Sequence, residues 1–129
     1  MPEFGGKAIQ ADIGGTMGER QTALACDLGA LSVDERARRS TLASRVFARF
    51  REVREMTDGY AGCLDPDPAI VQDAFDWLLL ERRCCPFLRL ELSFEPSNGP
   101  VWLHFRGGPG VKEFLGAAGL KASSPKNEA

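Results

Sequence analysis

The adjacent cysteines Cys84 and Cys85 are the side chains of this chain best suited to bind a metal ion or to take part in a redox reaction. Thiolates are soft ligands that select soft metal ions, and paired thiols also support redox reactions. Glu81 precedes the pair by about one helical turn, so its carboxylate can approach either sulfur. Cys26 would add a third sulfur if its distant segment lies beside the pair. Such a site would suit Hg(II), As(III) or Cu(I), or zinc with Glu81 or water as the fourth ligand.

Two other interpretations of the cysteine pair stay open. Free cysteines pack well as small apolar side chains, which would make the protein a structural or interaction module with a protein partner or a second copy of itself. The pair could also carry thiol redox chemistry. The negative end of a helix dipole disfavours a thiolate at a helix C-terminus, unless Arg82 and Arg83 turn towards the sulfurs. The spacing also differs from the two Cys-x-x-Cys knuckles of a zinc finger.

The composition predicts an ordinary single-domain protein, with 129 residues, 43% of them hydrophobic, four cysteines and a net charge of -2. No run approaches the roughly 18 apolar residues of a membrane span, and the first residues lack the features of a signal peptide. We therefore expect a cytoplasmic protein with reduced cysteines and no membrane partner. A disulfide between Cys84 and Cys85 would strain the peptide bond that joins them, so we expect it only as a redox state.

Several other residues are assigned ordinary roles. Cys63 follows a glycine in a predicted hairpin and is expected to be incidental. His104, the single histidine, should face away from the core, with a Cys–His pair as a secondary candidate. The arginines of the first helix are diluted by acidic residues and lack interleaved aromatics, so a solvated face is favoured over nucleic-acid binding. The run Gly107-Gly108-Pro109-Gly110 lacks the ending of a phosphate loop and predicts a turn.

Capping and turn signals predict the helices and strands on which these side chains lie. Ser32 and Glu35 match a capping box and begin a helix that should run to about Phe50. Asp67, followed by a proline, begins a second helix, which Pro86 should end because the residue before a proline is pushed out of the helical region. Alternating apolar residues and turn signals predict the remaining elements: strands at 22–26, 53–57, 60–64, 88–94 and 101–106, and a short helix at 111–118.

This order of elements predicts an α+β protein. We expect one two-layer domain over residues 20–119, with two main helices and a short C-terminal helix on one face of a largely antiparallel sheet of four or five strands. Residues 1–19 are rich in glycine and predict a flexible N-terminal arm, and residues 120–129 predict a flexible tail. Because Cys85 precedes a proline, it should be extended while Cys84 is still about helical, so the two side chains need not diverge.

Several short runs together resemble a family of small uncharacterised bacterial proteins. The most distinctive is Glu81-x-x-Cys84-Cys85-Pro86-Phe87-Leu88, and others are Ala25-Cys26-Asp27-Leu28, Asp58-Gly59-Tyr60, Gly99-Pro100-Val101-Trp102-Leu103 and Gly108-Pro109-Gly110. The resemblance covers about residues 22–118. Some members are encoded near heavy-metal resistance genes, especially those for mercury, which implies a metal-related role. Carried over by position, it implies Cys26, Glu81, Cys84 and Cys85 as the site and leaves Cys63 outside it.

The favoured function is therefore binding of a soft heavy-metal or metalloid ion, which the protein would sequester or transfer by ligand exchange. Cys84 and Cys85 would hold the ion, and Cys26 would complete the site. Glu81 would be a nearby ligand or proton acceptor. Nothing in the sequence resembles a complete catalytic apparatus, so an enzyme is the less favoured class.

Overall fold

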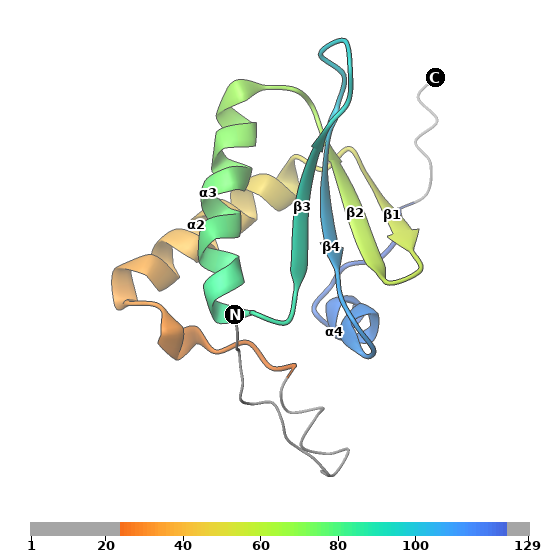
Figure 1. Ribbon diagram of the computed structural model, residues 1–129. Helices are drawn as coiled ribbons and strands as arrows, with labels where there is room; N and C mark the ends of the chain where they lie inside the picture. Colours follow the sequence, from red (N-terminus) through yellow and green to blue (C-terminus); the bar gives the residue numbers. More distant parts are fainter. Residues whose placement is uncertain (1–23, 124–129) are drawn as a thin grey trace.

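An antiparallel sheet of four strands carries three α-helices in the computed structural model, which describes residues 24–123 (Figure 1). The strands lie in the order β1-β2-β4-β3, so β1 and β3 are the two edges. The elements in chain order are η1 (Leu28–Ala30), α2 (Val33–Ala48), β1 (Glu52–Met56), β2 (Gly59–Leu64), α3 (Pro68–Cys84), β3 (Arg89–Phe94), β4 (Val101–Arg106) and α4 (Val111–Ala117). The predicted α+β class and antiparallel sheet are confirmed.

The two long helices begin and end where local signals place them. The Ser32 hydroxyl accepts a hydrogen bond from the Glu35 amide, and the Glu35 carboxylate accepts one from the Ser32 amide, which completes the predicted capping box of α2. The Asp67 side chain caps α3 by accepting from the amide of Ala69. Helix α3 ends at Cys84, immediately before the residue that precedes the proline, as predicted.

The sheet differs from the prediction at its expected first strand. Within residues 24–26, which belong to the strand predicted at 22–26, the chain forms a turn and irregular structure, and residues 22 and 23 lie outside the described part. The reason is tertiary, because the amide of Asp27 donates a hydrogen bond to the carbonyl of Cys84 at the end of α3. The segment therefore lies across the end of a helix, where no strand ladder is available to it.

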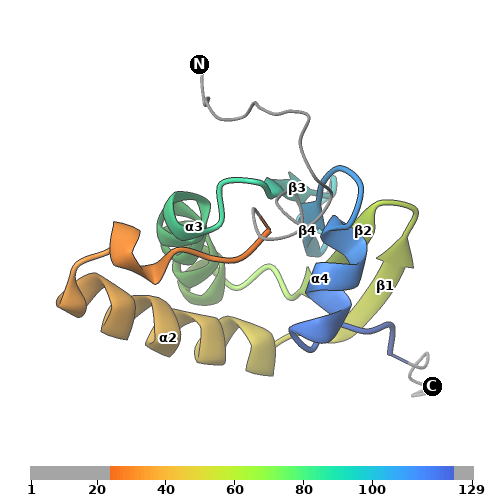
Figure 2. The same ribbon diagram turned by 90° about the horizontal axis from the view of Figure 1, so that it is seen from below.

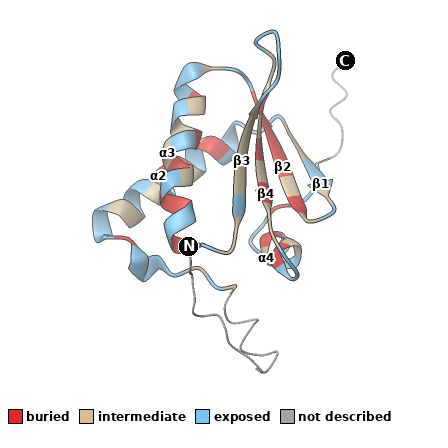
Figure 3. Ribbon diagram, in the orientation of Figure 1, coloured by how far each residue is buried: buried red, intermediate tan, exposed pale blue. Residues whose placement is uncertain are grey.

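The hydrophobic core lies between the helices and one face of the sheet (Figure 3). Val101, Leu103 and Phe105 of β4 are buried on this face and alternate with less buried residues, as the period of a strand requires. Helices α2 and α3 pack side by side, and α4 contacts β2 and β4 (Figure 2). All three helices contribute to one buried cluster, so they cover the same face of the sheet.

The packing at the ends of the fold adds two findings. Leu120, which we assigned to the flexible tail, is buried in the core, while the predicted arm at 1–19 and residues 124–129 lie outside the described part. Phe75 of α3 is 48% exposed, whereas Trp77 of the same helix is buried in the core. Among residues 24–123, no helix is both long and apolar enough to cross a lipid bilayer.

Candidate functional site

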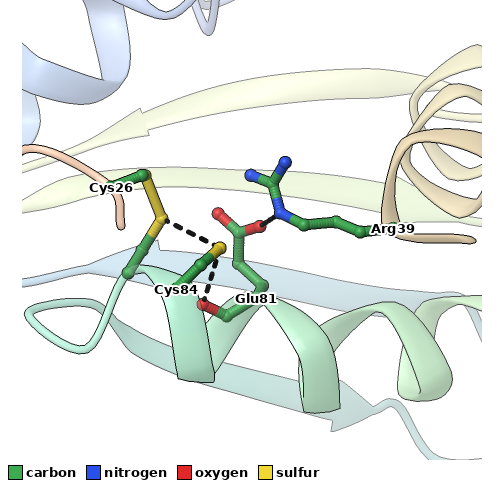
Figure 4. Close-up of a disulfide and its surroundings, with 5 residues drawn as sticks. Cys26, Arg39, Glu81 and Cys84 are labelled. Carbon is green, nitrogen blue, oxygen red and sulfur yellow. Dashed lines mark hydrogen bonds and ion pairs between the residues drawn. A yellow bond between two sulfur atoms is a disulfide. The ribbon is translucent and has the colours of Figure 1, made fainter. Parts of the chain in front are cut away.

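Cys26 and Cys85 are joined by a disulfide that links residues 59 positions apart in the sequence (Figure 4). The other two cysteines, Cys63 and Cys84, are free and buried. This finding corrects our interpretation of all four as reduced thiols. The expectation of reduced thiols depended on compartment and composition, whereas the disulfide forms because the fold brings two distant segments together.

The end of helix α3 brings the sulfur atoms together. Cys85 is the first residue beyond the helix, with a φ of -128° that turns its side chain away from the helical path. The Sγ of Cys84 consequently lies 3.7 Å from the Sγ of Cys85, and also 3.7 Å from the carbonyl oxygen of Glu81. The two side chains do not diverge, as the sequence allowed, and Cys26 adds its sulfur to the same cluster.

The carboxylate of Glu81 lies beside this sulfur cluster and is almost fully buried. The Nε of Arg39, on α2, donates to it over 2.7 Å (Figure 4). Burial of Arg39 lowers the pKa of its guanidinium, but the Glu81 carboxylate and the Cys84 thiol together raise that pKa above its usual value. Sequence reasoning missed Arg39, because its role depends on the contact between two helices.

Three of the four predicted ligands lie close enough together to hold a metal ion. One carboxylate oxygen of Glu81 and the Sγ atoms of Cys26 and Cys85 all lie within 4.8 Å of one another. Cys84 lies at the edge of this group, in contact with Cys85. A disulfide sulfur is not a thiolate, and the thiolate is the form that binds metal, so the full sulfur set exists only after the bond is reduced.

The free thiol of Cys84 lies in an environment that keeps it protonated. Burial raises the pKa of this thiol, the Glu81 carboxylate raises it further, and Arg39 offsets only part of the increase. Arg82 and Arg83 do not turn towards the sulfur and so do not lower the pKa of the thiol. Arg83 turns to the carboxylate of Glu35 on α2, and Arg82 is exposed. Cys84 is therefore a poor nucleophile at neutral pH in the oxidised protein.

The secondary candidates lie on the opposite face of the sheet. Cys63 is opposite Trp102, and the side chains of directly opposed strand residues share a face, so its thiol points away from the core. Burial raises the pKa of Cys63. His104 lies on that same outer face, with its Nδ1 3.3 Å from a carboxylate oxygen of Glu91. Neither residue belongs to the sulfur cluster.

The arginines of α2 bind acidic residues of the neighbouring elements. Arg38 and Arg45 form ion pairs with Asp76 and Asp73 of α3. These pairs tie the two helices together and neutralise much of the basic charge on α2.

Comparisons with protein-family models, with curated proteins and with solved structures find no match to this chain.

Proposed function

We propose that the reduced protein binds a soft metal or metalloid ion through Cys26, Cys84 and Cys85, with Glu81 as a further ligand or proton acceptor. Hg(II), As(III), Cu(I) and Zn(II) suit such a sulfur-rich set. The observation that carries the proposal is the convergence of Cys26, Glu81 and Cys85 within 4.8 Å, from two distant parts of the chain. The proposal agrees in kind with the metal-related role that the family resemblance implies.

The disulfide would be the closed state of this site. A dithiol reductant gives its two protons and two electrons to the bond between Cys26 and Cys85, and itself becomes a disulfide. The incoming ion then displaces the protons of the cysteine thiols. Oxidation of Cys26 and Cys85 by a disulfide removes two ligands and releases the ion.

The surroundings of the site support exchange of the ion with other thiols. Cys26 is only partly buried and lies in irregular structure outside the helix, so an incoming ligand can reach this sulfur first. The hydrogen bond from the Asp27 amide to the Cys84 carbonyl would still hold this segment against α3 after the disulfide is reduced. Arg39 supplies a positive charge that offsets part of the negative charge of the thiolates and of Glu81.

Thiol–disulfide exchange is a second candidate, because Cys84 lies 3.7 Å from one sulfur of a disulfide. In this reaction the Cys84 thiolate would attack the Sγ of Cys85. The bond to Cys26 would break, a Cys84–Cys85 bond would form, and Cys26 would leave as a thiolate, with no net change in oxidation. The raised pKa of Cys84 weighs against this reaction, since little thiolate is present at neutral pH.

A third candidate, a structural or interaction module, is favoured by the complete burial of Cys84 and Cys85. In that case the disulfide only fastens the segment before η1 to the end of α3. This module would carry no affinity for soft metals beyond that of any accessible thiol.

Metal titration of the reduced protein tests the proposal. The protein is reduced with a phosphine, the reductant is removed under anaerobic conditions, and Hg(II), Zn(II) or Cu(I) is added in competition with a chelator of known affinity. Cys26→Ser and the double variant Cys84→Ser/Cys85→Ser should weaken binding by more than the roughly 10- to 100-fold that loss of an outer-sphere partner costs. Cys63→Ser is the matched control, because this thiol is buried outside the site, and it should leave the affinity unchanged.

Two results would defeat the metal proposal. One is equal affinity of wild type and the Cys84→Ser/Cys85→Ser variant. The other is undiminished binding by the oxidised protein, in which Cys26 and Cys85 cannot act as thiolates.

A further inference from the structure

The two edges of the sheet differ in how their backbone groups are satisfied. At the β1 edge, the carbonyl of Val53 accepts from the Ser123 amide, and the Val53 amide donates to the Ser123 hydroxyl. At the opposite edge lies β3, which pairs with β4 on one side only (Figure 1). Within residues 24–123 no other segment pairs with the outer side of β3. An unpaired edge strand is a template for another strand.

The phase of the β3–β4 ladder shows which residues of β3 present their backbone outward. The amide of Glu95 donates to the carbonyl of Pro100, so this opposed pair is hydrogen-bonded. Along an antiparallel ladder, hydrogen-bonded pairs alternate with pairs that are not hydrogen-bonded. Ser93 and Glu91, two and four residues before Glu95, therefore also direct their backbone N–H and C=O groups to β4. The intervening residues Leu90, Leu92 and Phe94 therefore direct their N–H and C=O groups away from the sheet.

The same three residues adjoin an exposed apolar surface. A groove of about 370 Å³ lies between α3 and β3, lined by Phe75, Leu78, Leu79, Arg82, Leu88, Leu90 and Leu92. Phe75 is 48% exposed, Leu79 is 46% exposed, and Phe94 at the end of β3 is 65% exposed. An apolar groove beside an unpaired strand is typical of a surface that accepts a partner strand, whose backbone bonds the edge while its side chains fill the groove.

We propose that the partner is a second copy of this chain, whose β3 pairs antiparallel with β3 of the first. In an antiparallel pair of β3 strands, the residues whose backbone groups point outward must lie opposite each other so that they can exchange hydrogen bonds. These are the even-numbered residues of β3, so only registers that oppose even-numbered residues to even-numbered residues are possible. If the two-fold axis passes beside Glu91, the Glu91 side chains of the two copies lie opposite each other and repel. Centring the pair on Leu92 places Leu90 opposite Phe94 on the apolar face.

Charge complementarity favours the register centred on Leu92 over the one centred on Glu91. On the other face it sets Arg89 of one copy opposite Glu95 of the second, so unlike charges meet twice across the two-fold axis. The exposed ring of Phe94 then lies over Leu90 of the second copy, beside the groove that Leu79 and Phe75 line. The two sheets become one continuous sheet of eight strands, four from each copy.

Sedimentation velocity of the full chain over a range of concentrations tests this interface. The wild type should sediment as a dimer, and Phe94→Lys should raise its dissociation constant by about tenfold or more, because two buried rings are lost and two charges are added. Val33→Lys is the matched control, since Val33 is 71% exposed on α2 and lies outside the groove. It should leave the dimer intact. A monomeric wild type, or a Phe94→Lys variant that dimerises as well as wild type, would overturn the proposal.

Amide hydrogen exchange tests the register itself. The amides of Leu90, Leu92 and Phe94 should become more protected as the protein concentration rises, while those of Glu91 and Ser93 stay equally protected. Protection of the three outward amides that does not depend on concentration would show that another part of the same chain covers this edge. That result would also overturn the dimer.

Discussion

The amide of Asp27 donates a hydrogen bond of 2.7 Å to the carbonyl of Cys84. This carbonyl belongs to the last turn of α3, where no helical amide is available to it. The bond therefore satisfies the end of a helix and at the same time fixes the residue after Cys26. It explains how Cys26 comes to lie beside Cys85, and it should keep the three sulfurs together when the disulfide is reduced.

Reduction of the disulfide should lower the free energy of unfolding by about 4 kcal/mol at most, the chain-entropy value for a loop of 59 residues. Urea denaturation of the oxidised and reduced wild type would measure the difference. Cys26→Ser should behave like the reduced wild type under both conditions. Equal denaturation midpoints for oxidised and reduced wild type would contradict a stabilising role for the bond.

Replacing Arg39 by methionine should destabilise the protein by about 3–5 kcal/mol, because it leaves the buried Glu81 carboxylate without its partner. Arg38→Met is the matched control. Its ion pair with Asp76 is largely solvated, with the Arg38 side chain 56% exposed, and its loss should cost about 0–1 kcal/mol. The double variant Arg39→Met/Glu81→Met should recover most of the lost stability. If Arg39→Met proves no more costly than Arg38→Met, the pair is not a structural support of the site.

The free thiols of the oxidised protein should react slowly with iodoacetamide near pH 8. Cys84 and Cys63 are buried, and burial raises the pKa of both thiols, so each has little thiolate and little access. Mass spectrometry of a labelling time course should show modification only on the timescale of unfolding. After reduction, the partly exposed Cys26 should label before Cys85. Rapid labelling of Cys84 in the oxidised native protein would instead favour the thiol–disulfide exchange candidate.

The protein should lose stability in acid through Glu35. Hydrogen bonds from Arg83, and then from the Ser32 amide, lower the pKa of this carboxyl to about 2 from the ordinary value of 4.5. A depressed folded-state pKa contributes stability that is complete above about pH 4.5 and is lost as the pH falls towards 2. NMR titration of Arg83→Gln should show the pKa of Glu35 rising towards its ordinary value.

Arg82→Gln is the matched control for this titration, because Arg82 is the neighbouring exposed arginine and forms no ion pair with any residue in 24–123. It should leave the pKa of Glu35 near 2. An unchanged Glu35 titration in the Arg83→Gln variant would mean that Arg83 does not cause the shift.

Features that depend on neighbouring residues could be predicted from the amino-acid sequence. Ser32 and Glu35 specify the start of α2, because a capping box needs only residues three apart. Pro86 specifies the end of α3 and the divergence of Cys85 from the helix, because its ring restricts the residue before it. The same local rule indicated that the side chains of Cys84 and Cys85 need not diverge.

Which distant residues meet at those local features depends on how the helices and strands pack. Four cysteines allow several pairings, and only the position of the segment before η1 makes Cys26 the partner of Cys85. Residues 24–26, the described part of the strand predicted at 22–26, are irregular for the same reason, since the next residue, Asp27, bonds a carbonyl at the end of α3. Arg39 reaches Glu81 only because α2 packs on α3. Contacts between segments far apart in the sequence leave no periodic or capping pattern, so they cannot be predicted from composition and spacing.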